Sequence, residues 1–476
     1  MMRALRINAE RLQSNIRELA SFGLNEATHG LDRTTFTPAE RAAREWLKGK
    51  LRDQQLTVRV DEAANIWATR RGLGDADTPG APDGTGDADP SRALDATENL
   101  EALGVSTASG ESAGYGGSSG SSGSGAAPSP SRLPAIAFGS HIDTVPNGGK
   151  YDGALGVLLA LEVMTVLEEN RISTRHPLEL VSFSAEEPNP FGLSTFGSRA
   201  VSGKLSRSDL VGVRNDQGEL LTEALLLAGG DPVCFEQCRR EPGELAAFLE
   251  VHIEQGKRLL DRDIPVGIVT AITGIYREEI TVTGEANHAG ATLMADRKDA
   301  LMGASEMMLA FEAVCRNHPA DEAVGTIGRI RNEPNAANII PERVVFHLEA
   351  RGETSEQIRE IIEAWGKQAE DIAGSRGLRL ERRLILDQAP QPLDDLIMEV
   401  CAAQAEMLGI PGLRLGSMAG HDATHMASLT RAGMLFVPSL GGKSHCPEEE
   451  SRIEDIEKTG NVLLQSILAL DGQLSR

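Results

Sequence analysis

Four short stretches of this 476-residue sequence place imidazole and carboxylate side chains where they could hold a metal ion. In the first stretch, His141 and Asp143 are two residues apart, and Asp152 follows in a glycine-rich turn. Side chains two apart on a strand emerge on one side, and a metal-binding imidazole needs a partner on its other nitrogen. We expect Asp143 to orient His141 and Asp152 to bridge two cations. A His-x-Asp pair by itself also fits an ordinary surface turn.

Two adjacent carboxylates form the second stretch. Glu186 and Glu187 follow the apolar run 178–183, and Pro188 ends regular strand pairing there. Like charges side by side at a sheet edge are costly unless a cation lies between them. The pattern favours one carboxylate as a metal ligand and the other as the acceptor of a proton from water. The alternative is a solvated acidic turn, which is common in so acidic a chain.

The third and fourth stretches each contribute one histidine. His252 interrupts the apolar run 248–253, and His445 lies in a loop rich in Gly, Ser and Pro. Each has an ordinary alternative, a hydrogen-bonded core histidine for His252 and an exposed loop histidine for His445. Together, three histidines and two carboxylates are the number needed by two divalent ions that share Asp152. The cysteines do not have the paired spacing of a structural zinc site.

The sequence around these side chains predicts an α/β arrangement of the elements that position them. Residues 135–138 predict a strand, 155–167 a helix and 178–183 a second strand, with a further strand at 248–253. Strands that alternate with helices in this way form a sheet of parallel strands that is covered on both faces.

A different pattern occupies residues 272–388. It predicts a strand at 279–283, a helix at 299–316, a strand at 344–349 and a helix at 355–374. We interpret this β-α-β-α series as a small α+β domain inserted into the larger one, because residues 389–470 return to α/β character.

Residues 74–132 hold 12 of the 50 glycines and carry a net charge of −7. So few apolar side chains cannot offset the entropy of ordering the segment, and we expect a disordered Gly/Ser/Asp-rich insert. A partner-binding segment is the alternative. The whole chain has a net charge of −23, which excludes nucleic acid and anionic membranes as partners. Five scattered cysteines, no signal peptide and no long apolar run predict a cytoplasmic protein without a membrane span.

The order His…Asp…Glu-Glu…His…His resembles the M20 family of dinuclear metallohydrolases, and most closely its hydantoinase/carbamoylase subgroup. The resemblance runs from about residue 8 to 470, except for the insert. It rests on these motifs: Gly139–Gly156, Ala185–Glu187, His252-Ile-Glu-Gln-Gly, Asn287-His288-Ala-Gly, Asn338-Ile-Ile-Pro with Arg351, Ala419-Gly-His-Asp422 and Ser444-His445.

The resemblance implies a role for each of twelve residues. The metal ligands would be His141, Asp152 and His252 for one ion, and Asp152, Glu187 and His445 for the other. The catalytic residues would be Glu186 as general base, His288 as oxyanion donor and Asp143. The substrate would be bound by Gln255, Asn338, Arg351 and Gly420, with Asn338 and Arg351 on its carboxylate. The two divalent ions could be Zn, Mn, Co or Ni.

The fold implied by the resemblance is α/β. A dinuclear metallohydrolase catalytic domain with a mixed, mostly parallel sheet (1–271 and 389–476) would carry an inserted small α+β lid and dimerisation domain (272–388). The implied activity is hydrolysis of a linear ureido C–N bond, with release of ammonia and carbon dioxide. The substrate would be an N-carbamoyl-L-amino acid or an allantoate-type compound, and the protein a homodimer in which His288 serves its own or the partner's site. An M20 aminopeptidase or deacylase and a non-catalytic binding paralogue are the alternatives.

Overall fold

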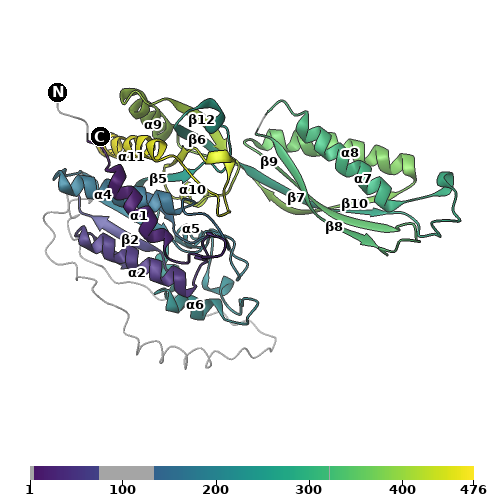
Figure 1. Cartoon of the computed structure of the whole chain (residues 1–476), viewed down its shortest axis with the longest axis horizontal. Coiled ribbons are helices and arrows are strands. Elements are labelled where there is room, and N and C mark those ends of the chain that lie inside the picture. Colours follow the sequence, from purple (N-terminus) through teal and green to yellow (C-terminus); the bar gives the residue numbers. More distant parts are fainter. Residues whose placement is uncertain (1–4, 74–132, 321, 476) are drawn as a thin grey trace, which may run out of the picture.

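The computed structural model describes residues 5–73, 133–320 and 322–475, so the disorder expected for 74–132 lies outside the described residues. These residues form two lobes, a large one with a mixed sheet and a small one with an antiparallel sheet (Figure 1). The small lobe projects from the large one, and the chain crosses between them where β6 leads into β7 (Figure 1).

Nine strands of the described residues build the large sheet. They are β1 (Thr57–Val60), β2 (Ile66–Arg70), β3 (Ala135–His141), β4 (Leu178–Phe183), β5 (Leu245–Ile253), β6 (Val266–Ile272), β11 (Gln391–Pro392), β12 (Gly412–Ser417) and β13 (Ala432–Val437). Their order is β1-β2-β4-β3-β5-β13-β6-β11, and β12 pairs with β6. The four central strands β4, β3, β5 and β13 are mutually parallel, whereas β1 and β2 extend the sheet in antiparallel pairs. Parallel strands direct their carboxyl ends to one edge, which is where such sheets bind ligands.

Helices cover both faces of this sheet. One face carries α1 (Ala9–Ala20), α2 (Pro38–Asp53), α4 (Ala154–Glu169), α9 (Asp395–Met407) and α11 (Ile453–Leu474). The other face carries the short helices α5 (Phe196–Val201), α6 (Leu221–Leu227) and α10 (Ala423–Met426). Single 3-10 turns occur at Arg207–Asp209, Phe235–Cys238, Leu260–Arg262, Met294–Asp296 and Leu440–Gly442.

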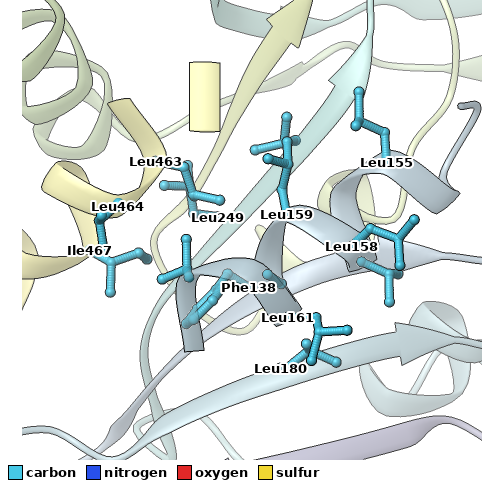
Figure 2. Packing of buried hydrophobic residues seen from close by; sticks show 14 of the residues in the cluster. Phe138, Leu155, Leu158, Leu159, Leu161, Leu180, Leu249, Leu463, Leu464 and Ile467 are labelled. Atoms are coloured by element: carbon cyan, nitrogen blue, oxygen red, sulfur yellow. The ribbon is translucent and has the colours of Figure 1, made fainter. Parts of the chain in front are cut away.

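Helix α4 is the centre of the main core. It is apolar on all sides because it lies between the sheet and the outer helices, and its leucines contact side chains of β3, β4, β5 and α11 (Figure 2). Its one internal acid, Glu162, is fully buried and accepts a hydrogen bond from Arg11 Nε at 2.7 Å. No helix among the described residues has the length and apolarity to cross a membrane.

The small lobe is a four-stranded antiparallel sheet with two helices on one face. Its strands are β7 (Gly274–Thr283), β8 (Val324–Glu333), β9 (Arg343–Gly352) and β10 (Arg379–Gln388), in the order β10-β7-β9-β8. Its helices are α7 (Ala300–Arg316) and α8 (Ser355–Arg376). Burial alternates strictly along β9, so the face with Phe346 packs against Phe311 and Trp365 while the other face stays accessible. The helices and strands expected from the sequence in this region are present.

Candidate metal centre

The carboxyl edge of the large sheet brings together segments that are far apart in the sequence. His141 ends β3 beside Phe183 of β4, three residues before Glu186. His252 in β5 is paired with Phe436 of β13, the strand that leads into the loop with His445. The parallel register of these strands is therefore what collects the candidate residues at one place.

Two groups of three side chains at this edge are each close enough to hold an ion. The first comprises His141, Asp152 and His252, and the second comprises Asp152, Glu187 and His445. Within each group the ligand atoms lie within 4.8 Å of one another. Asp152 belongs to both groups, with Oδ1 3.1 Å from His252 Nε2 and Oδ2 3.4 Å from His445 Nε2. These are the same five residues that the sequence motifs select as ligands.

The two buried histidines present the correct nitrogen for metal binding. His141 Nδ1 lies 3.1 Å from the backbone oxygen of Asp143, and His252 Nδ1 lies 2.9 Å from that of Ile253. A carbonyl oxygen can only accept, so Nδ1 carries the proton on both rings. Each Nε2 then lies near Asp152 Oδ1, at 3.7 Å for His141 and 3.1 Å for His252, and His252 Nε2 also accepts the Gly153 N–H at 3.2 Å. Metal-bound histidines are oriented in the same way when the protein holds their other nitrogen.

Glu186 lies beside the first group, with Oε2 3.6 Å from His141 Nε2 and a side chain that is 11% exposed. The carboxylate of Asp143 fixes this segment by accepting the backbone N–H groups of Glu186 at 3.3 Å and Glu187 at 3.2 Å. Burial raises the pKa of Glu186 well above its usual range; the charge of His141 opposes this shift and that of Glu187 reinforces it. A carboxylate whose pKa is raised is a better proton acceptor than an ordinary glutamate.

The centre carries an excess of negative charge. Four carboxylates, Asp143, Asp152, Glu186 and Glu187, have only histidines as ion-pair partners in the part of the chain that the structure describes. Hydrogen bonds to Asp152 and Glu187 raise the pKa of His445 to about 11. Glu187 Oε1 is buried, and its ion-pair partner among the described residues is His445 Nε2, at 3.3 Å. A buried carboxylate oxygen among nitrogen and oxygen donors with surplus negative charge fits divalent cations.

Gln255 lies between the two groups. Its Nε2 donates to Asp152 Oδ2 at 2.8 Å and to Ser444 Oγ at 3.3 Å. Its Oε1 is buried and has no hydrogen-bond partner among the described residues. The amide therefore supports the shared carboxylate and keeps one acceptor free at the centre.

The remaining candidates for catalysis and for substrate binding lie in two separate places. Arg351, near the end of β9 that adjoins the large lobe, donates from Nη1 to the backbone oxygen of Met418 at 2.9 Å, two residues before Gly420. His288 and Asn338 lie at the other end of the small sheet, where the Ala289 N–H donates to the Asn338 oxygen. A ten-residue strand spans about 30 Å, so Asn338 is remote from Arg351 within one chain.

His288, at this end of the small lobe, has the tautomer of a hydrogen-bond donor at Nε2. His288 Nδ1 accepts the backbone N–H groups of Gly290 at 3.0 Å and Ala291 at 3.2 Å. The proton of the neutral ring is therefore on Nε2, and the side chain is exposed. Among the described residues, no acceptor lies within hydrogen-bond distance of His288 Nε2.

Residues 137–469 match the family model of peptidase family M20/M25/M40. The chain belongs to this family. It is 32% identical over 464 residues to the N-carbamoyl-L-amino acid amidohydrolase of Geobacillus stearothermophilus, covering 98% of this chain and 99% of that protein. It is 37% identical over 329 residues to the allantoate amidohydrolase of Bacillus subtilis, covering 68% and 77%. A solved amidase of the hydantoinase/carbamoylase family from Burkholderia multivorans shares 28% identity with a TM-score of 0.79, covering 98% of each chain.

Membership of the M20 family confirms the resemblance read from the motifs. The family is metal-dependent, and the two groups around Asp152 are the candidate ligands of this M20 chain. His421 is a neighbour of the centre and belongs to neither group, since its Nε2 lies 2.7 Å from Ser417 Oγ and its ring packs against His252. His425 contacts Thr195 and Lys204.

Sequence reasoning missed two residues that shape the centre. Thr35 donates to Asp143 Oδ2 at 2.6 Å, and Glu449 accepts the backbone N–H of Asp152 at 3.0 Å. Glu449 is the middle member of three consecutive glutamates, Glu448–Glu450, which as a sequence reads as a solvated run. The only available signal was its position four residues after His445.

Proposed function

We propose that this M20 chain hydrolyses a linear ureido C–N bond in an N-carbamoyl-L-amino acid or an allantoate-type substrate. Two amidohydrolases named for these substrates are among its relatives. The observation that carries the proposal is the sharing of Asp152 by two ligand groups, with the Glu186 carboxylate beside the first. This arrangement suits attack of water on a carbonyl carbon.

In this proposal His141, Asp152 and His252 hold one divalent ion, and Asp152, Glu187 and His445 hold the other. Bound Zn, Mn, Co or Ni ions would supply Lewis-acid polarisation of the carbamoyl oxygen and lower the pKa of water. Asp143 keeps the His141 ring and the Glu186 segment in fixed positions through the hydrogen bonds described above.

Glu186 moves the proton. Its Oε2 accepts a proton from the attacking water, whose oxygen forms a bond to the carbamoyl carbon. The same carboxyl group then returns that proton to the leaving nitrogen as the C–N bond breaks, and ammonia leaves. The carbamate that remains loses carbon dioxide to give the free amine. The raised pKa of Glu186 favours the first of these transfers, because it makes the carboxylate a better proton acceptor.

Arg351 and Gly420 bind the substrate at the junction of the lobes, where the guanidinium offers a planar fork for a carboxylate. His288 and Asn338 act in the partner subunit's site of a homodimer. The separation of these two residues from Arg351 along β9 supports this assignment, because one chain does not bring them to one substrate. His288 Nε2–H would donate to the oxyanion.

The test is a comparison of products over a small substrate panel. Metal-free protein is loaded with Zn or Mn and given N-carbamoyl-L-amino acids, allantoate, N-acetyl amino acids and dipeptides. Ammonia release from the ureido compounds alone is the expected result. Cleavage of dipeptides or acetyl amino acids without ammonia release would instead identify a peptidase or deacylase, and no turnover of any compound would favour a binding paralogue.

A further inference from the structure

The segment that carries Asp152 and the segment that carries His445 are about three hundred residues apart, and one buried side chain joins them. Glu449 Oε1 accepts the backbone N–H of Tyr151 at 2.8 Å and that of Asp152 at 3.0 Å. Its Oε2 lies 3.1 Å from Ser444 Oγ, next to His445 in the sequence. A single carboxylate therefore contacts both segments at once.

The protein makes room for this carboxylate. Glu449 is 2% exposed, although it lies on a loop between two more accessible glutamates. Gly149 borders the carboxylate, and a Cβ added at Gly149 would overlap it. Burial of an acid is costly, so a buried position with three polar contacts indicates that Glu449 has a specific role.

The contacts of Glu449 reach both the backbone and, through Ser444, the side chain of Asp152, the residue shared by the two ligand groups. Ser444 Oγ lies 2.7 Å from Asp152 Oδ2, so the same hydroxyl contacts both carboxylates. Glu449 holds the backbone of Asp152, and through Ser444 it reaches the side chain as well. Asp152 Oδ1 faces the first ligand group and Oδ2 the second. A rotation of this carboxylate would take both oxygens away from their groups.

We infer that Glu449 is a positioning residue that holds Asp152 between the two ion positions, so that its loss weakens both ions together. The inference rests on the proposed metal centre. Positioning groups behind metal ligands typically change metal affinity by about 10- to 100-fold. Removal of Glu187, a member of only the second group, should instead weaken one ion.

The neighbouring residue provides a matched control. Glu450 joins the same two segments from the outside, by an ion pair with Lys150 at 2.7 Å and a hydrogen bond with the Tyr151 hydroxyl. It is half-exposed and contacts neither Asp152 nor Ser444 in the interactions of the described residues. If Glu449 only anchored the loop, Glu450→Ala would have the same effect as Glu449→Ala.

The experiment titrates Co2+ into metal-free full-length protein and follows the visible absorption of the bound ion against a competing chelator. Wild type is compared with Glu449→Ala, Glu449→Gln, Glu450→Ala and Glu187→Gln. We expect Glu449→Ala to weaken both ions by about 10-fold or more. Glu449→Gln should stay within about threefold of wild type, because its amide oxygen can still accept the two backbone N–H groups. Glu450→Ala should also stay close to wild type.

Three results would overturn the inference: unchanged Co2+ affinity in Glu449→Ala, equal losses in Glu449→Ala and Glu450→Ala, or a loss in Glu449→Gln as large as in the alanine variant. If Glu449→Ala does not fold, Gly149→Ala is the test of the inference. Its methyl group displaces the Glu449 carboxylate from its position while the residue itself remains. Gly149→Ala should then weaken both ions, and wild-type affinity in it would overturn the inference. A wild-type protein that binds no Co2+ would contradict the proposed metal centre itself, which is a distinct outcome.

Discussion

Asp143 accepts the backbone N–H of Glu186, with 3.3 Å between Asp143 Oδ1 and the Glu186 nitrogen. The other oxygen of the same carboxylate accepts Glu187 N–H at 3.2 Å and the Thr35 hydroxyl at 2.6 Å. One buried side chain thus positions both the proposed base and the ligand that follows it. These hydrogen bonds fix the backbone of both adjacent glutamates.

The first prediction concerns the proposed base. Glu186→Gln keeps the shape of the side chain and removes its ability to accept a proton, so kcat should fall by about 10²- to 10⁴-fold. The content of bound metal should not change, because Glu186 belongs to neither ligand group. Initial rates of ammonia release and metal analysis of the same sample measure the two effects. Activity close to wild type would show that another group accepts the proton.

The second prediction concerns Asp143. Asp143→Asn keeps only one acceptor oxygen for three donors, so the Glu186 segment loses its fixed orientation, whereas the His141 ring keeps its contact with the backbone oxygen of residue 143. We expect kcat to fall by about 10- to 100-fold, and KM to change little. Thr35→Val, which removes one of the three donors, should have a smaller effect in the same direction. An effect on KM alone would contradict a role of Asp143 at the reacting atoms.

The third prediction tests whether His288 serves the partner subunit's site. Glu186→Gln and His288→Asn should each be nearly inactive alone. If His288 acts in the partner subunit's site, a hybrid dimer of the two variants contains one site in which both Glu186 and His288 are intact. Random mixing should then restore about one quarter of wild-type activity. A mixture that stays as inactive as its components would place His288 in its own subunit's site.

The fourth prediction concerns substrate binding by Arg351. A lysine cannot provide the planar fork, so Arg351→Lys should raise KM about 10-fold or more while kcat changes little. Arg277 is a matched control, because it also pairs with Glu349 but lies on the neighbouring strand. Arg277→Lys should leave KM near the wild-type value. The KM difference between Arg351→Lys and wild type should disappear for a substrate analogue whose carboxylate is replaced by an amide.

The fifth prediction is a pH dependence of stability from His425. Burial, together with the charges of Lys204 and Arg199, lowers the pKa of His425 to about 3. The folded state thus binds this proton less readily than the unfolded state, whose histidine pKa is about 6.5. The stabilisation is present above about pH 6.5 and is lost as the pH falls towards 3, by about 1.4 kcal/mol at pH 5.5.

Urea unfolding of wild type and His425→Gln at about pH 8 and pH 5.5 measures this contribution, because other titrating groups cancel in the difference. The variant should lose less stability on acidification than wild type. Parallel losses in the two proteins would show that His425 does not contribute.

The sequence by itself predicted the residues of the proposed centre and several of the elements around it. Apolar runs followed by His141 and Glu186, and one interrupted by His252, predict strands with candidate residues at or near their ends. Parallel strands direct these ends to one edge of their sheet. The motifs were also specific enough to indicate the M20 family. These inferences depend on local patterns, which a sequence carries directly.

Only the tertiary structure decided which groups meet. Glu448, Glu449 and Glu450 are chemically identical neighbours, and only the packing against Gly149 makes the middle one a buried partner of Asp152. The sequence predicts the same role, binding of the substrate carboxylate, for Arg351 and Asn338. In the structure they lie at opposite ends of the small sheet, separated by the length of β9. Burial and long-range distance arise from contacts between residues hundreds of positions apart, and a local pattern contains no information about them.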